Sequence, residues 1–62
     1  MSVKRRDLIK YLENNGFTIL REGANHSIYT NGVMTIPIKR HRQIDRITAN
    51  ELCKQAGLAP KY

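Results

Sequence analysis

Apolar residues in the first part of the chain stand three to four positions apart, as they do on one face of a helix. They are Leu8, Ile9, Tyr11 and Leu12. This spacing predicts a helix over residues 3–15. Ser2 is its expected N-cap, and Gly16 is expected to end it in a left-handed conformation.

After Gly16 the pattern changes to β-branched and aromatic residues, which favour strands. Residues 17–21 predict a first strand, and residues 26–30 predict a second one beyond a loop that contains glycine. Asn31-Gly32 predicts a two-residue type I′ turn, because that turn needs positive φ at both central positions. Residues 33–38 are then the antiparallel partner of the second strand.

A two-residue turn also predicts a register, which pairs Thr30 with Val33, Tyr29 with Met34, and Ile28 with Thr35, and which brings His26 near Pro37. Tyr29 then shares one face of the sheet with Met34, Ile36 and Ile38, which is the expected core side. His26 falls on the opposite face.

The basic residues 39–42 predict an exposed loop, after which Ile44 and Ile47 are expected to return the chain to the core. Residues 48–51, Thr-Ala-Asn-Glu, have the form of a capping box, so a second helix is expected to start at Thr48. Its apolar stripe consists of Ala49, Leu52, Cys53 and Ala56.

The second helix is expected to end at Gly57, with Leu58 making the apolar contact of a Schellman motif. Residues 59–62 are expected to be loose. The elements together predict one α+β domain over residues 1–62, with the order α-β-β-β-α and both helices on one face of a three-stranded antiparallel sheet. Double-stranded-RNA-binding domains have this order, but a fold alone does not establish a function.

Composition narrows the class of protein. A chain of 62 residues with 40% hydrophobic residues can bury one thin core, which excludes a large enzyme scaffold. Eleven Lys and Arg against five Asp and Glu give a net charge of +6, which favours a polyanionic partner. No run approaches the roughly 20 apolar residues of a membrane span, and no signal segment follows the basic start. We therefore expect a soluble, cytoplasmic protein.

The single cysteine, Cys53, excludes an intramolecular disulfide and a multi-cysteine zinc site. It falls on the apolar stripe of the second helix, so a packing thiol is expected rather than a nucleophile. Neither histidine has a neighbour at metal-ligand spacing, and no metal site is predicted. Tyr29 is expected to be a core ring with its hydroxyl toward the surface.

His26 follows the glycine-containing loop and starts a predicted strand, so a rigid element holds the ring while solvent reaches it. With an ordinary pKa of about 6.5, an imidazole can take a proton from an RNA 2′-hydroxyl or give one to a leaving 5′-oxygen. A lone histidine is more often satisfied by one structural hydrogen bond. From the residues alone, both interpretations stay open.

Two basic segments are candidates for phosphate contacts. The first comprises Lys39, Arg40, His41 and Arg42, and the second comprises Arg5, Arg6 and Lys10 on the first predicted helix. Guanidinium and ammonium groups bind phosphates without reading sequence. A solvated loop and a solubilising helix face are the alternatives.

Four segments carry a resemblance to a known family: Leu-Glu-Asn-Asn-Gly-Phe at 12–17, Gly-Ala-Asn-His-Ser-Ile-Tyr at 23–29, Thr-Ile-Pro-Ile-Lys-Arg-His-Arg at 35–42 and Cys-Lys-Gln-Ala-Gly-Leu at 53–58. Together they resemble the HicA toxins, small ribonucleases of bacterial and archaeal toxin–antitoxin systems that cleave mRNA and have the double-stranded-RNA-binding fold. The similarity covers nearly the whole chain. Two departures are Asn25, in place of the family's usual Ser before the histidine, and Lys39, in place of a common second proline.

The resemblance implies that His26 is the catalytic residue and that His41 is an RNA contact or an auxiliary acid–base group. Lys39, Arg40 and Arg42 are expected from their charge to be further RNA contacts. The supporting residues of the histidine motif are Gly23, Asn25 and Tyr29.

The activity that the resemblance implies is metal-independent mRNA cleavage without a cofactor, which a HicB-type antitoxin with an acidic contact surface would inhibit. Two other classes remain as alternatives. A non-catalytic RNA-binding module would use the same charge but tolerate loss of His26. A small DNA-binding regulator is disfavoured, because the Asn31-Gly32 hairpin interrupts any helix-turn-helix.

Overall fold

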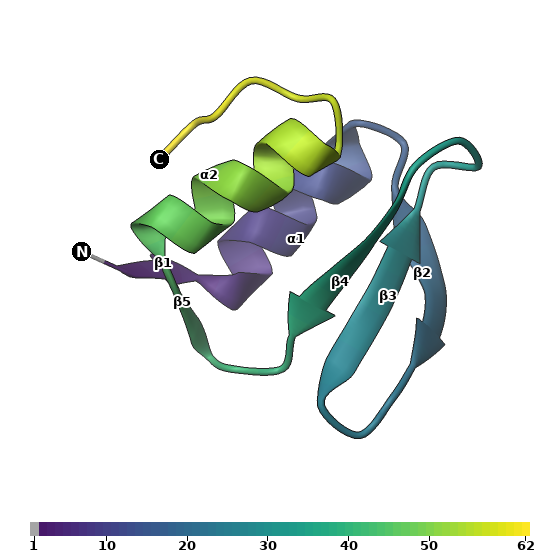
Figure 1. Cartoon of the computed structure of the whole chain (residues 1–62), viewed down its shortest axis with the longest axis horizontal. Helices are drawn as coiled ribbons and strands as arrows, with labels where there is room; N and C mark the ends of the chain where they lie inside the picture. The colour runs from purple at the N-terminus through teal and green to yellow at the C-terminus, as the bar shows by residue number, and fades with distance from the viewer. Residues whose placement is uncertain (1) are drawn as a thin grey trace.

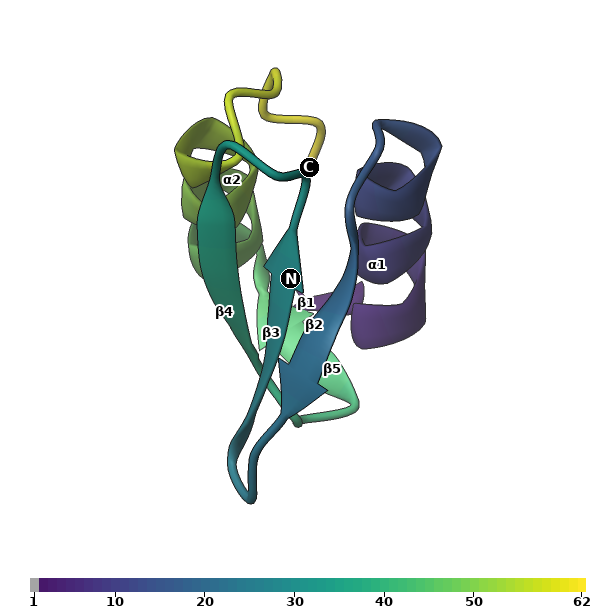
Figure 2. The same cartoon turned by 90° about the vertical axis from the view of Figure 1, so that its right-hand side faces the viewer.

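The computed structural model describes residues 2–62 and has the predicted α+β architecture. Strands β2 (Thr18–Glu22), β3 (His26–Thr30) and β4 (Thr35–Lys39) form an antiparallel sheet in the order β2-β3-β4. Helices α1 (Arg5–Asn14) and α2 (Arg46–Gln55) lie together on one side of this sheet (Figure 1). Figure 2 looks onto the sheet with both helices behind it, so the other face of the sheet is open in the described part of the chain.

A second, two-stranded sheet was not predicted. Strand β1 (Ser2–Lys4) pairs antiparallel with β5 (Gln43–Asp45), and the paired Val3 and Ile44 are both buried. The first helix therefore begins at Arg5 instead of residue 3, and the prediction of Ser2 as its N-cap is wrong. The Ser2 hydroxyl instead donates to the Gln43 side-chain oxygen at 2.6 Å. Three residues are too few to show an alternating pattern, so only the distant partner strand defines β1.

The predicted hairpin is present, but its turn and register differ from the prediction. Thr30 pairs with Thr35 and Tyr29 with Ile36, which leaves a four-residue loop over residues 31–34. The Asn31 side-chain oxygen accepts from the N–H groups of Val33 and Met34, at 2.9 and 2.7 Å. An Asx-type loop of this kind competes with the type I′ turn.

The change of register is two residues, so the side chains keep their predicted faces. Tyr29, Ile36 and Ile38 are all buried on the helix-covered face, as expected, while Met34 lies in the loop and is 39% exposed. His26 pairs with Lys39, two residues beyond the predicted Pro37, although His26 and Pro37 still line one pocket. It remains on the open face of the sheet.

Helix α2 begins at Arg46, two residues before the predicted capping box. Asp45 is its N-cap, and the Asp45 carboxylate accepts from the Ile47 N–H at 3.0 Å. Aspartate is as good a cap as threonine, and the pairing of β5 with β1 already holds the chain at this point. The predicted anchoring by Ile44 is confirmed, whereas Ile47 is 69% exposed and the prediction for it is wrong.

Both helices end in the predicted way. Gly16 and Gly57 have positive φ, at 89° and 75°. The N–H of Phe17 donates to the Leu12 carbonyl at 3.0 Å, and the N–H of Leu58 donates to the Cys53 carbonyl at 2.8 Å. Each is the 6→1 hydrogen bond of a Schellman motif. Phe17, which follows Gly16 in the first of these motifs, is buried.

The core lies between the sheet and the helices. Its buried apolar residues are Val3, Leu8, Leu12, Phe17, Tyr29, Ile36, Ile38, Ile44, Ala49, Leu52, Cys53 and Ala56. The C-terminal segment closes over this core and is not loose, contrary to expectation. The Tyr11 hydroxyl donates to the Ala59 carbonyl at 3.0 Å, and the Tyr11 and Tyr62 rings meet edge to face at 6.5 Å. Neither helix is long and apolar enough to cross a membrane, as far as residues 2–62 are concerned.

Candidate functional site

His26 is the first residue of β3, and its side chain is exposed. Its carbonyl accepts from the Gly23 N–H at 2.8 Å, which closes the turn between β2 and β3. Lys39, the last residue of β4, is its partner across the sheet. The Cβ atoms of such a pair lie about 5 Å apart on the same face. The imidazole and the Lys39 side chain therefore start from neighbouring positions at the rim of the sheet.

Arg40 holds the loop that precedes His26. Its backbone N–H donates to the Asn25 carbonyl at 3.2 Å, and its guanidinium donates to the Gly23 carbonyl at 3.1 Å. Gly23 and Asn25, the residues predicted to support the histidine, contribute their main-chain carbonyls to these bonds. These bonds join the histidine loop to the basic segment that follows β4.

A polar network around the buried Ser27 lies on the other side of the same strand. Ser27 is fully buried, and its hydroxyl accepts from the Arg5 guanidinium at 2.7 Å and donates to the Glu22 carboxylate at 3.3 Å. The Arg5 guanidinium also donates to the Lys39 carbonyl at 3.0 Å. The Arg5 N–H in turn donates to the Arg42 carbonyl at 2.9 Å. Arg5 therefore joins the start of α1 to β3, to β4 and to the basic loop.

Sequence reasoning missed Ser27 and Glu22, although one signal was available. Ser27 stands two residues before Tyr29 and so shares its core-facing side. A hydroxyl at a core position requires a partner, because a buried polar group without a hydrogen bond is costly. The sequence does not show that the partner is Arg5, because Arg5 lies 22 positions from Ser27.

An open pocket of about 310 Å³ surrounds the exposed histidine and is called here the His26 pocket. Its lining residues are Ala24, Asn25, His26, Lys39, Arg40 and His41. The fold thus brings together both histidines of the chain and two cations from the predicted basic segment. Gly23, Arg42 and Tyr29 do not line it.

A second pocket of about 520 Å³ adjoins the first and is called here the basic pocket. It is lined by Lys4, Arg5, Arg6, Arg40, His41, Arg42 and Gln43. The two pockets share Arg40 and His41. The two predicted basic segments therefore meet at one place, with the exception of Lys10 and Lys39, which do not line this pocket.

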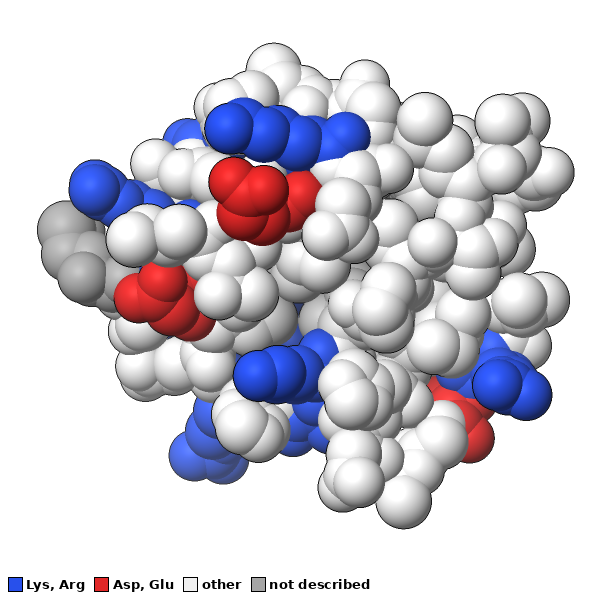
Figure 3. Space-filling view, in the orientation of Figure 1, with Lys and Arg blue, Asp and Glu red and all other residues white. Residues whose placement is uncertain are grey.

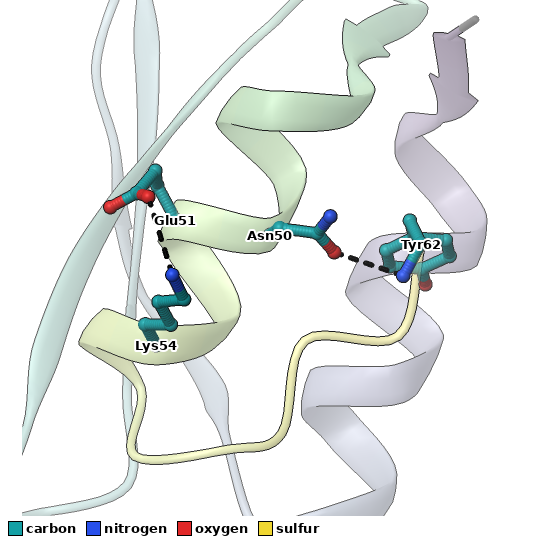
Figure 4. Close-up of polar contacts among 4 residues, drawn as sticks. All are labelled: Asn50, Glu51, Lys54 and Tyr62. Atoms are coloured by element: carbon teal, nitrogen blue, oxygen red, sulfur yellow. Dashed lines mark hydrogen bonds and ion pairs between the residues drawn. The ribbon is translucent and has the colours of Figure 1, made fainter.

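The charges of the basic pocket are not neutralised within the protein. Figure 3 shows Lys and Arg side chains gathered at the lower edge of the molecule, near the loop between β4 and β5, with no acidic side chain visible among them. Across residues 2–62, the one ion pair within 4.0 Å joins Lys54 to Glu51 on α2 (Figure 4). An anion is therefore a suitable ligand for this surface.

A third pocket, of about 620 Å³, lies on the other side of His26 and is called here the β2-side pocket. It is lined by Arg21, Glu22, Gly23, Ala24, Asn25, His26, Ile28 and Pro37. It shares His26 and two loop residues with the His26 pocket. The His26 pocket therefore lies between the basic pocket and the β2-side pocket.

Two residues that sequence analysis considered for chemistry belong to the core. Tyr29 is 7% exposed, and its burial raises the pKa of the phenol above the usual 10.0. Cys53 is fully buried, and burial raises the pKa of its thiol above the usual 9.0. The thiol stays protonated near neutral pH, so the prediction of a packing cysteine is confirmed. In the part of the chain that the structure covers, no three side chains of His, Cys, Asp or Glu gather as ligands around a metal ion would.

The arrangement suits an anionic substrate with exchangeable protons, because it places imidazole groups beside cations at an open surface. Comparison with protein families identifies a match over residues 5–58 to the family described as "HicA toxin of bacterial toxin-antitoxin". Comparison with curated proteins and with solved structures gave no match. The matched region runs from the start of α1 to the Schellman motif after α2 and includes all three pockets except Lys4. The resemblance noted from the four sequence segments is therefore confirmed, and the chain belongs to the HicA toxin family of toxin–antitoxin systems.

Proposed function

We propose that this protein is an endoribonuclease that cleaves mRNA, with His26 as the catalytic residue. One observation carries the proposal: in a chain of the HicA family, the exposed His26 lies in a pocket that also contains Lys39, Arg40 and His41. Two histidines can act as general base and general acid in the transfer of an RNA phosphodiester, and two cations can stabilise the charge that develops on the phosphate.

RNA carries its own nucleophile, the 2′-hydroxyl. In the proposed reaction His26 takes the 2′-hydroxyl proton, the 2′-oxygen bonds to phosphorus, and the bond from phosphorus to the 5′-oxygen breaks. The leaving 5′-oxygen receives a proton from the second histidine, His41, which lines the same pocket. The products are a 2′,3′-cyclic phosphate and a 5′-hydroxyl, and the two histidines are reset by exchanging protons with water.

Negative charge builds up on the non-bridging phosphate oxygens during this reaction. Lys39 and Arg40 line the pocket and are placed to stabilise it, which is the role that fixed cations have in phosphoryl transfer. Because the nucleophile is part of the substrate and both proton carriers are side chains, we expect the reaction to need no metal ion or other cofactor.

Membership of this family implies an antitoxin partner. We propose that a HicB-type antitoxin inhibits the protein by covering the His26 pocket. An acidic contact surface on the antitoxin would complement the net charge of +6.

The test compares the wild-type protein with His26→Ala and His41→Ala on single-stranded mRNA and on an RNA duplex, with and without EDTA. We expect the His26→Ala rate to fall by about 10²–10⁴-fold, the usual effect of losing a general acid or base. Lys10→Gln, which removes one positive charge outside the pockets, is the matched control and should keep the wild-type rate. The ends of the products are mapped in the same reactions.

Several outcomes would contradict the proposal. If wild type and His26→Ala bind RNA equally and neither cuts it, the protein is a non-catalytic RNA-binding module. Cleavage that requires magnesium, or products that end in a free 3′-hydroxyl, would exclude the chemistry given above.

A further inference from the structure

We propose that the basic pocket binds an RNA backbone phosphate next to the one that is cleaved, and that the substrate strand runs from the His26 pocket toward the start of α1. The inference rests on the proposed ribonuclease function for its catalytic meaning. The binding site itself is argued from the charges, contacts and order of the pockets.

The first observation is the concentration of charge. Lys4, Arg5, Arg6, Arg40 and Arg42 line one pocket, and no carboxylate lies within 4.0 Å of any of their charged nitrogens in the described chain. Like charges held together repel one another, and a bound anion removes that repulsion. Five cations without a counter-charge therefore favour a ligand of repeated negative charge.

The second observation is that these cations divide into anchored and free groups. The Arg5 guanidinium donates to Ser27 and to the Lys39 carbonyl, and the Arg40 guanidinium donates to the Gly23 carbonyl. By contrast, the side chains of Arg6 and Arg42 donate no hydrogen bond to any described residue, and both residues are exposed. Arg5 and Arg40 thus fix the walls of the pocket, while Arg6 and Arg42 keep their donors for a ligand.

The third observation gives the direction of the strand. A strand with its scissile phosphate at His26 carries one further phosphate on each side. On one side lies the basic pocket, which shares Arg40 and His41 with the His26 pocket. On the other side lies the β2-side pocket, which contains one cation, one carboxylate and the apolar Ile28 and Pro37. Phosphate is favoured only on the side toward α1.

An acidic segment of a protein partner is the competing ligand for such a surface. The order of the pockets favours RNA, because phosphates recur at every nucleotide and a strand in the His26 pocket necessarily passes close to the next pocket.

The experiment uses the full chain with His26→Ala, which keeps the RNA intact during binding. Arg6→Gln/Arg42→Gln is compared with Lys10→Gln/Lys54→Gln, which removes the same charge from exposed positions outside the basic pocket. The dissociation constant for a single-stranded 12-nucleotide RNA is measured by fluorescence anisotropy over a range of salt concentrations. Urea midpoints verify that both double variants fold.

We expect the arginine double variant to bind at least tenfold more weakly at low salt. The slope of log affinity against log salt should fall in magnitude by about 0.7 for each phosphate contact that is lost from a single strand. The lysine double variant should lose less than threefold. Equal losses in the two double variants would overturn the inference, because the RNA affinity would then depend on net charge alone and not on the position of the two arginines.

Two further measurements separate the alternatives. With His26 intact, the arginine double variant should raise KM for RNA cleavage more than it lowers kcat. If no form of the protein cleaves RNA, the proposed function fails while the binding comparison still decides the site. If RNA affinity is unchanged but affinity for the purified antitoxin falls, the pocket is a protein contact and the inference is wrong.

Discussion

At the scale of single residues, Arg5 bonds to three other parts of the fold, β3, β4 and the loop after β4, although sequence analysis considered it only as a phosphate contact. One half-buried side chain bonds to the Ser27 hydroxyl and the Lys39 carbonyl, and its backbone bonds to Arg42. The guanidinium suits this position because its donors are fixed in a planar fork, which a lysine lacks. Arg5 therefore positions the rims of both the His26 pocket and the basic pocket.

We predict that Arg5→Met destabilises the protein by about 1–3 kcal/mol, the usual cost of removing a hydrogen-bond partner from a buried polar group. The group concerned is the hydroxyl of Ser27, which is fully buried and would keep only its 3.3 Å bond to Glu22. Urea unfolding measures the effect. In a Ser27→Ala background the same substitution should cost less, because the buried acceptor is already gone.

The adjacent arginine provides the matched control. Arg6 is exposed and its side chain makes no hydrogen bond to a described residue, so Arg6→Met should change stability by no more than about 0.5 kcal/mol. Equal effects of Arg5→Met and Arg6→Met would show that the network around Ser27 does not contribute to folding.

At the scale of elements, the two helices end in the same motif, but the surroundings of their glycines differ. A Cβ added to Gly16 would have no heavy atom within 4 Å, whereas a Cβ added to Gly57 would lie 3.3 Å from the Met34 sulfur. Both positions have positive φ, which an L-residue with a side chain disfavours. The end of α2 is therefore packed against the β3–β4 loop, while the end of α1 is open.

We predict that Gly16→Ala costs about 1–2 kcal/mol, which is the conformational penalty of the left-handed region. Gly57→Ala should cost more, because Met34 must also move. Thermal or urea unfolding of the two variants measures the difference. Gly23→Ala is the control, since Gly23 has no positive φ and its added Cβ would make an ordinary contact at 3.4 Å. If Gly23→Ala were the most costly of the three, this account of the helix ends would be wrong.

At the scale of the whole molecule, three acids from different elements, two of them buried and one half-buried, share one property. Burial is the main cause that raises the pKa of Tyr29 in β3, of Cys53 in α2 and of Tyr62 in the C-terminal segment. A pKa raised by folding means that the folded state favours the protonated form. This contribution is complete below the ordinary pKa values of 9.0 and 10.0, and it is lost as the pH rises through the folded values.

We therefore predict that the free energy of unfolding falls as the pH rises above about 9, the region in which these groups begin to ionise in the unfolded chain. Urea titrations at pH 7, 9 and 10.5 measure this fall. Tyr29→Phe removes one of the three groups, so its loss of stability between pH 7 and 10.5 should be smaller than that of the wild type. Because the two proteins differ only at residue 29, the comparison isolates the tyrosine. A steeper loss in Tyr29→Phe would contradict the stated cause.

Features that depend on neighbouring residues were predictable. The apolar spacing of α1 and α2, the glycines after them and the alternation in β3 each lie within about ten residues, so local conformational preferences and periodicity determine them. The faces of the sheet were also predicted correctly despite a wrong turn, because the register moved by two residues and side chains alternate with a period of two. His26 was placed correctly at the exposed start of a strand for the same reason.

Only the tertiary structure determined the contacts between residues that are far apart in the chain. The pairing of β1 with β5 moved the starts of both helices, and the contacts of the C-terminal segment with Tyr11 span 48 positions. The Arg5 network and the shared lining of the three pockets likewise join α1 to β3, β4 and the loop after β4. No local pattern specifies such contacts, because the free energy of each depends on which distant groups the packed core brings within hydrogen-bond distance. The sequence by itself determined the helices, the sheet faces and the exposed histidine, whereas only the folded chain determined which cations surround that histidine.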